Sequence, residues 1–192
     1  RFLEAVQLGA LGTVQRLASQ VHDPMIPRNL RIVNPSDGWT TLMYAVLSGS
    51  FMMVRWILDQ GHDTPDRPSC SYDRRTVLHL VAELGHEDIL QLYLQRFPQL
   101  LEAKDRSGRT PLLVASRYGH EGLVEALLAL DALVDAVDVE GNTALHYASA
   151  WGHLPIIRLL ILHGCKYSMR NTAGWSASDW AFSPATRSVL EE

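Results

Sequence analysis

Histidines recur at regular positions along the chain, and histidine is the side chain best suited to acid–base or metal chemistry near neutral pH. His146 and His153 are seven residues apart, so both can lie on one face of a helix. His79 and His86 repeat this spacing, and His120 is a further member of the series. Two histidines on one helical face could bind a zinc ion if further ligands joined them. The first question is whether these residues form such a site.

Corresponding segments elsewhere in the chain lack these histidines. Met43 and Leu113 stand where His146 would be, and Ser50 stands where His153 would be. A set of zinc ligands would not be replaced by side chains that bind no metal, and neither H-E-x-x-H nor a pair of C-x-x-C motifs occurs. The sequence therefore predicts structural histidines, no metal site and no cofactor.

Nucleophiles and carboxylates give no stronger signal. The motifs G-x-S-x-G, Walker A and G-x-G-x-x-G are all missing from the sequence, and no carboxylate pair stands out. Cys70 and Cys165 are too few for a disulfide framework and lack metal spacing, which favours free thiols in a reducing compartment. Cys70 lies in a Pro-rich segment and would be reactive only if exposed. We therefore expect a cytoplasmic protein that is not an enzyme.

The histidines recur because the chain is built from repeats. Thr40, Thr76, Thr110 and Thr143 are 36, 34 and 33 residues apart, and a weaker copy has Ser176 a further 33 residues on. Nine residues after each threonine comes a glycine, at Gly49, Gly85, Gly119 and Gly152. Two independent markers thus keep one period, which indicates an array of similar units.

Each unit is expected to be a pair of helices, because apolar residues recur at helical spacing on both sides of the middle glycine. Thr is a good N-cap, Pro111 suits a first helical turn, and the glycine can end the first helix in the left-handed conformation. The second helix is expected to end near Gly61 or Gly164. Asp131 holds that place in one copy, where we expect a weaker end.

A period near 33 with the motifs T-P-L-H-x-A and G-H resembles the ankyrin repeat, over nearly the whole chain. The resemblance implies an all-α solenoid of about six stacked helix pairs with turn and hairpin loops, in one domain of residues 1–192. The expected units are roughly 1–35, 36–70, 71–104, 105–137, 138–170 and 171–192, with atypical first and last copies. The spacing is longer in two places, which hold Pro24, Pro27 and Pro35, then Pro65, Pro68 and Cys70. Both are expected to be surface loops on the side of the turns.

Composition points to a protein partner. The net charge of −4 argues against nucleic acid as a partner, because binding to phosphate needs an excess of basic residues. No apolar run approaches the roughly eighteen residues of a membrane span, so direct membrane insertion is not expected. Of the 17 basic residues only Lys104 and Lys166 are lysines, and arginine is the cation favoured at protein interfaces.

In ankyrin arrays the turn tips and the exposed end of each first helix form a concave face that binds partners. Carried onto this chain, the resemblance gives as partner-binding residues Trp39, Arg75, Arg106, Arg109, Arg117, Tyr118, Asn142, Trp151 and Trp175. Arginine, tyrosine and tryptophan are the usual hot-spot residues of interfaces. We expect an acidic or mixed partner segment, anchored by Tyr118 and Trp151 and oriented by Arg109 and Arg117.

Some segments are more particular. Residues 38–45 (GWTTLMYA), 60–63 (QGHD), 78–87 (LHLVAELGHE) and 94–98 (LQRFP) look similar to the ankyrin-repeat accessory subunits of fungal TOR complex two. That resemblance implies a non-catalytic scaffold in a kinase complex at the plasma membrane. The alternative is a substrate-recruiting ankyrin head of a larger enzyme, such as a palmitoyltransferase. A stand-alone metal enzyme and a regulator that masks a DNA-binding partner fit the residues less well.

Overall fold

The computed structural model describes residues 2–19 and 30–191, which form two compact units, 1–98 and 99–192. Pro24 and Pro27, expected in a surface loop, lie outside the described residues. That residues 1–192 form one domain stays a prediction. No helix in the described part of the chain is long and apolar enough to cross a membrane.

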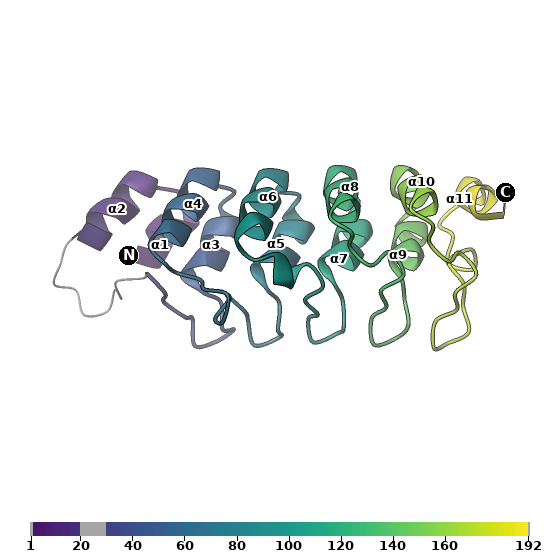
Figure 1. Cartoon of the computed structure of the whole chain (residues 1–192), viewed down its shortest axis with the longest axis horizontal. Helices are drawn as coiled ribbons and strands as arrows, with labels where there is room; N and C mark the ends of the chain where they lie inside the picture. Colours follow the sequence, from purple (N-terminus) through teal and green to yellow (C-terminus); the bar gives the residue numbers. More distant parts are fainter. Residues whose placement is uncertain (1, 20–29, 192) are drawn as a thin grey trace. The chain divides into compact units, whose positions relative to one another are not determined.

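The described residues of the N-terminal unit form three helix pairs (Figure 1). Their bounds are α1 Phe2–Gln7, α2 Leu11–Ser19, α3 Thr41–Leu47, α4 Phe51–Asp59, α5 Val77–Leu84 and α6 Glu87–Arg96. The first helix of each pair packs against the first helix of the next, α1 on α3 and α3 on α5, and α4 packs on α6. The first helices lie nearer to the turns, which all project to one side (Figure 1).

The C-terminal unit repeats this plan with two helix pairs and a final single helix. A 3-10 helix, η1, spans Pro98–Leu100 at the border of the two units. The other bounds are α7 Pro111–Tyr118, α8 Glu121–Ala129, α9 Ala144–Trp151, α10 Leu154–Leu162 and α11 Pro184–Glu191. Again the first helices pack together, α7 on α9, and the second helices pack together, α8 on α10. The expected helical repeat fold is confirmed.

The sixth unit, expected to be an atypical last copy, has one helix in place of a pair. Residues 177–180 form turns, and only α11 follows them in the described residues. Both the backbone N–H and the hydroxyl of Ser176 donate to the carboxylate of Asp179, at 2.8 and 2.7 Å. Such local side-chain bonds offer the backbone an alternative to a helix, and Pro184 disfavours helical geometry at the residue before it. The copy keeps the turn of the repeat and loses its first helix.

The helix ends follow the repeat markers. The Thr143 hydroxyl accepts the backbone N–H of His146 at 3.4 Å, and Thr40 and Thr110 cap their helices in the same way. Gly119 ends α7 with a φ of 83°, in the left-handed region that glycine tolerates best. Both expectations are confirmed. Asp131 also takes a left-handed φ, 63°, which costs a residue with a Cβ about 1 kcal/mol.

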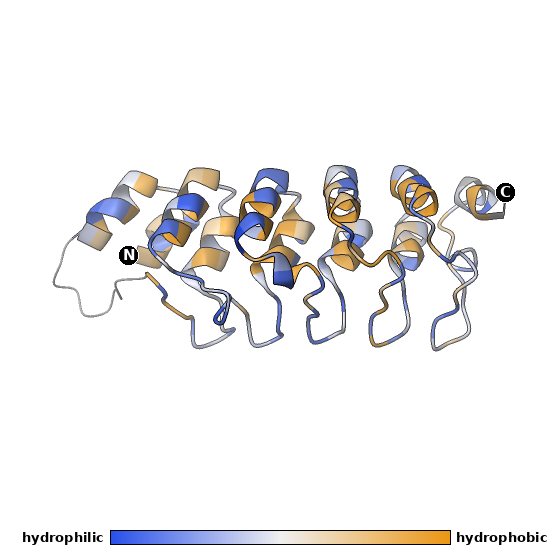
Figure 2. Cartoon of the chain, in the orientation of Figure 1, coloured by the Kyte–Doolittle hydropathy of each residue, from blue (hydrophilic) through white to orange (hydrophobic). Residues whose placement is uncertain are grey.

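The core lies between the helices. Apolar side chains of α5 and α6 are buried on their facing sides, and the same holds for α7 to α10. Figure 2 shows much orange on these helices, with blue on the turns and on parts of the second helices. Because no helix pair can bury both its faces alone, each pair depends on its neighbours in the unit.

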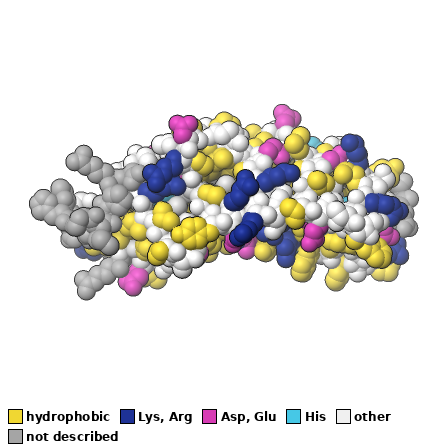
Figure 3. Space-filling view, turned by 90° about the horizontal axis from the view of Figure 1, so that it is seen from below, with side chains coloured by type: hydrophobic (Ala, Val, Ile, Leu, Met, Phe, Trp, Pro, Cys, Tyr) yellow, Lys and Arg dark blue, Asp and Glu magenta, His cyan; other side chains and the backbone are white. Residues whose placement is uncertain are grey.

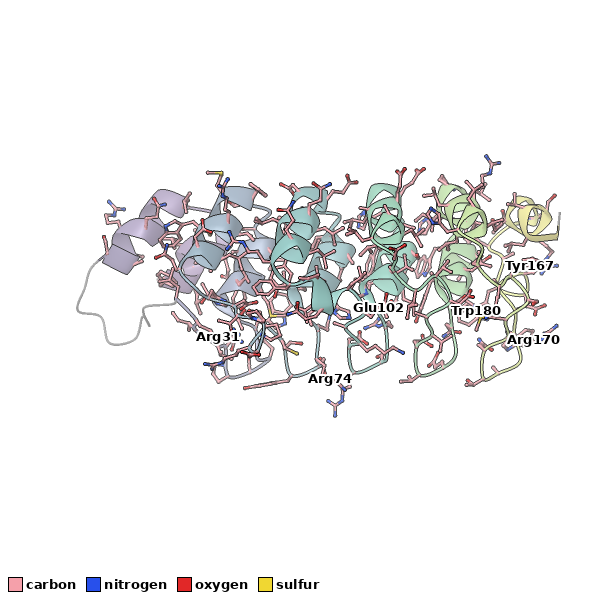
Figure 4. The ribbon with its side chains drawn as sticks, viewed as in Figure 1. Arg31, Arg74, Glu102, Tyr167, Arg170 and Trp180 are labelled. Atoms are coloured by element: carbon pink, nitrogen blue, oxygen red, sulfur yellow. The ribbon has the colours of Figure 1, made fainter. Side chains whose placement is uncertain are left out.

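The long loop of residues 62–74 departs from the expectation of a surface loop. Residues 64–67 and Cys70 are exposed, but His62, Asp63, Ser69 and Ser71 are buried. The prediction is therefore wrong for these four residues. Figure 4 shows Arg31, which pairs with this segment, on the turn side of the helices.

A buried carboxylate holds this loop. Asp63 accepts hydrogen bonds from Arg31 at 2.9 Å, from the Tyr93 hydroxyl at 2.6 Å and from His62 Nδ1 at 2.8 Å. The backbone N–H and the hydroxyl of Ser69 donate to it as well, each at 2.7 Å. Burial alone would raise the pKa of Asp63, but the hydrogen bonds from His62 and Tyr93 outweigh it and the pKa falls below 3.8. The loop is thus tied to α6 through one charge.

Replacing Asp63 with Asn tests that role. The change removes the negative charge that faces the largely buried Arg31 guanidinium, so the free energy of unfolding should fall by about 3–5 kcal/mol, measured by urea unfolding. Asp59→Asn removes the more exposed pair with Arg96 and should cost less than about 1 kcal/mol. Equal effects in the two variants would contradict the assignment.

The same carboxylate predicts a pH dependence. Because the folded pKa of Asp63 lies below 3.8, its stabilisation is complete above the unfolded value and is lost as pH falls through the folded pKa. The wild type should therefore lose stability steeply below about pH 4. The Asp63→Asn variant should show a smaller loss over that range in the same urea titrations, and parallel curves would speak against the network.

The two cysteines should differ in reactivity. Burial, with the charge of Asp135 adding to it, raises the pKa of Cys165 to about 11. Cys70 is exposed, and the charges of Arg74 and Arg31 oppose the smaller rise that partial burial causes in its pKa. Iodoacetamide at pH 8 should modify Cys70 at least about tenfold faster, as followed by mass spectrometry. In Cys70→Ser only the slow reaction should remain; a fast one there would refute the ranking.

Candidate functional site

The histidines serve the fold. His146 is buried, its Nδ1 lies 2.9 Å from the Thr143 hydroxyl, and its Nε2 lies 3.0 Å from the carbonyl oxygen of Trp175. Burial lowers the pKa of His146. His153 Nε2 lies 3.1 Å from the carbonyl oxygen of Arg117. Both rings thus bond across units of the repeat. Among the residues that the structure describes, no group of three His, Cys, Asp or Glu side chains could hold a metal ion.

A pocket of about 350 Å³ lies in the C-terminal unit, between the end of α7, the turn before α9, and α9 itself. It is lined by Ser107, Arg109, Arg117, Asp138, Val139, Glu140, Asn142, Tyr147, Ala150, Trp151 and Trp180. Figure 4 shows Trp180 below α9, on the side of the turns. On the face seen from that side, basic side chains lie interspersed with hydrophobic ones (Figure 3).

Four of the nine expected partner-binding residues line this pocket: Arg109, Arg117, Asn142 and Trp151. Arg106, Tyr118 and Trp175 belong to the same unit but do not line the pocket. Tyr118 and Trp175 are about half exposed.

The remaining two expected residues, Trp39 and Arg75, belong to the N-terminal unit. Trp39 packs against Tyr44 with ring centroids 5.5 Å apart, and Arg75 pairs with Glu83.

Asn142 differs from expectation because its side chain is not free. It is buried, and its amide nitrogen donates to Asp138 and to Glu140, each at 3.2 Å. Its amide oxygen accepts from Asn171 at 2.9 Å, which connects two consecutive turns. Asn142 is therefore a buried support of the pocket that it also lines, and its contact with a partner stays a prediction.

The two arginines of the pocket are in different electrostatic states. Arg109 donates to the buried carboxylate of Asp105 through Nε at 2.9 Å and forms an ion pair through Nη2 at 2.7 Å. Burial would lower the pKa of Arg109, but Asp105 raises it. Arg117 has no ion pair with a carboxylate in the described part of the chain. Its guanidinium carbon lies 5.8 Å from the ring centroid of Tyr118 and 6.0 Å from that of Tyr147. Arg117 thus supplies the uncompensated positive charge.

Sequence reasoning missed the Asp and Asn side chains that shape the turns. Asp105, Asp138 and Asn171 are 33 residues apart, and each accepts the backbone N–H groups two and four residues further on. The regular spacing of these three residues was the available signal, because Asp and Asn side chains stabilise turns in this way.

Sequence reasoning also missed Tyr147, Ala150 and Trp180. The Tyr147 hydroxyl donates to Asp138 at 2.6 Å, and burial together with that carboxylate raises its pKa, so the phenol stays neutral. Ala150 stands where the preceding copy has Arg117, and its small side chain leaves space in front of Tyr147. Trp180 meets the His146 ring edge-on, with centroids 5.7 Å apart. Its place in the pocket follows from the missing helix of the last unit.

The family model described as "Ankyrin repeats (3 copies)" matches residues 2–98 and 78–171. The chain is 28% identical over 132 residues to "Target of rapamycin complex 2 subunit AVO2" of Saccharomyces cerevisiae, covering 69% of this chain and 30% of that protein. It is 35% identical over 133 residues to human "Ankyrin repeat domain-containing protein 63", covering 66% and 32%.

A further match is "Putative glutaminase 3" of Caenorhabditis elegans, 30% identical over 121 residues, covering 59% of this chain and 20% of that protein. The chain thus spans about a third or less of the length of these relatives. Since the family model covers well over half of the residues and the helix pairs follow its period, the chain belongs to the ankyrin-repeat family.

Proposed function

We propose that this chain is a non-catalytic protein-interaction module, whose partner segment binds the turn side of the C-terminal unit. The observation that carries the proposal is the pocket, in which the charge of Arg117 has no carboxylate partner in the described residues and Trp151 is 57% exposed. A large exposed aromatic ring beside an uncompensated arginine is typical of an interface hot spot.

The neighbouring surface fits the same role. Tyr118 and Trp151 end α7 and α9 at equivalent positions, and both are large apolar side chains that face solvent. Burying such rings against a partner removes apolar area from water at about 25 cal/mol per Å². Val139, at the tip of the turn, adds a further exposed apolar side chain. Covering this surface with a partner would therefore be favourable in free energy.

The finer proposal is an accessory subunit of a TOR-type kinase complex. The similarity to the yeast protein named as a subunit of target of rapamycin complex 2 supports it. Such a subunit would work in the cytoplasm and reach the plasma membrane through its complex. The other candidate is a substrate-recruiting segment of a larger enzyme, which the similarity to a protein named as a glutaminase favours. Affinity purification from the source cell with mass spectrometry separates the two, through the presence or absence of kinase-complex subunits.

A double substitution tests the binding surface. Arg117→Ala with Trp151→Ala should reduce partner recovery in a pull-down at least about tenfold, because both hot-spot side chains are lost. Neither residue is fully buried, so the melting temperature should change by less than about 2 °C. The matched control is Arg158→Ala with Leu162→Ala, which removes the same kinds of side chain from the exposed face of α10. If partner recovery fell only in this control, the binding surface would lie on the second helices instead.

A further inference from the structure

We propose that the pocket of the C-terminal unit takes a single acidic residue of a partner peptide. The carboxylate of an Asp or Glu would bind Arg117, and an apolar neighbour in the peptide would pack on Trp151 and Trp180. This inference rests on the proposed function, because it specifies what the binding surface recognises.

Arg117 is the centre of the argument. Its contacts with Tyr118 and Tyr147 hold the guanidinium in place, with its carbon 5.8 and 6.0 Å from the ring centroids. Aromatic rings attract a cation but carry no net charge to neutralise it. The guanidinium therefore keeps its capacity for charge-assisted hydrogen bonds, and a carboxylate is the group whose geometry matches it in a bidentate pair.

Asp138 and Arg109 are already engaged within the unit. Asp138 accepts from the backbone N–H groups of Glu140 and Asn142, from the amide of Asn142 and from the Tyr147 hydroxyl. Arg109 is paired with Asp105. An incoming anion therefore meets one uncompensated cation, at the end of α7.

Glu140 limits how acidic the partner can be. It is exposed in the turn, where its carboxylate lies 3.2 Å from the amide nitrogen of Asn142. The pocket is thus positive at the end of α7 and negative at the turn. A peptide with one acidic residue satisfies Arg117, whereas a run of acidic residues would also meet Glu140 and be repelled.

A carboxylate fits this pocket better than a phosphate group. Phosphorylated segments are typically recognised by clusters of arginines, which balance a charge near −2. Here Arg109 is engaged with Asp105, which leaves Arg117 alone. A single guanidinium balances a single carboxylate.

The apolar neighbour in the peptide is inferred from the aromatic residues that line the pocket. Trp151 is 57% exposed and Trp180 is held edge-on against His146, so the two indoles flank the pocket on the side of α9 and the last turn. Ala150, whose side chain is a single methyl group, lines the pocket together with Arg117 and these rings. A side chain next to the acidic residue would be buried there.

The test is a selection of random decapeptides displayed on phage, run in parallel on the wild type, on Arg117→Met and on Arg158→Met. Wild type and Arg158→Met should enrich peptides that carry one Asp or Glu beside an aromatic or aliphatic residue. Arg117→Met should lose the acidic preference and keep the apolar one. Arg158 lies exposed on α10, so it controls for loss of charge alone.

Affinities of one enriched peptide then quantify the contact by fluorescence anisotropy. Replacing its Glu with Gln should weaken binding to the wild type about 10- to 100-fold, as for a hydrogen bond to a charged group, and binding to Arg117→Met less than about threefold. A phosphoserine peptide that binds more tightly than the Glu peptide would identify a phosphorylated partner and overturn the carboxylate assignment.

A second variant guards against damage to the fold. Ala150→Glu places a carboxylate in the pocket, where it can pair with Arg117 and occupy the site of the peptide. Ala150→Glu should weaken peptide binding at least about tenfold without lowering the melting temperature. Unchanged binding in Ala150→Glu would contradict the proposed place of the peptide.

The outcomes distinguish failure of the proposed acidic-residue specificity from failure of the proposed binding function. If the wild type enriches no peptide, the proposed binding surface fails, and the inference fails with it. If it enriches peptides without acidic residues, or if Arg117→Met keeps the acidic preference, the binding function stands and only the carboxylate is refuted.

Discussion

The close approach of consecutive units is the constraint on which the C-terminal unit depends. A Cβ at Gly119 would lie 2.6 Å from Cε1 of His153, so only glycine allows the histidine of the next copy to pack there. That histidine bonds the carbonyl oxygen of Arg117 and so fixes the end of α7. His146 meets Trp180 edge-on in a similar way. The histidines that resembled a site in the sequence instead position two walls of the pocket.

What the sequence predicted is what local rules determine. Threonine caps, left-handed glycines and helical periodicity each act within a few residues, so the helix pairs were readable from the period alone. The burial of Asp63 could not be predicted in this way, because it depends on Arg31 and Tyr93, each about 30 residues away in the chain. The last copy was expected to be atypical, but which helix it lacks depends on side-chain bonds of Ser176 that compete with the backbone.

The pocket could be predicted only in part for the same reason. Arg117 and Trp151 stand out as residue types at positions that the repeat leaves free. Whether such a position is available depends on its neighbours, and Asn142 shows this, since Asp138 and Asn171 bury its amide. Ala150 carries no signal by itself, yet the space that it leaves makes the pocket. Function here lies in differences between adjacent copies, which a family pattern averages out.

The charged residues of the chain have two roles, stabilising the fold and binding a partner. Asp63, Asp105 and Asp138 are buried, and each accepts several donors from its own unit, so their charges stabilise loops and turns and have little left for a partner. Arg117 receives support from rings that do not neutralise it. Unfolding free energy should therefore respond to the carboxylates and partner affinity to the arginine. A repeat protein can then change partners by altering a few side chains while the bonds that hold its turns stay the same.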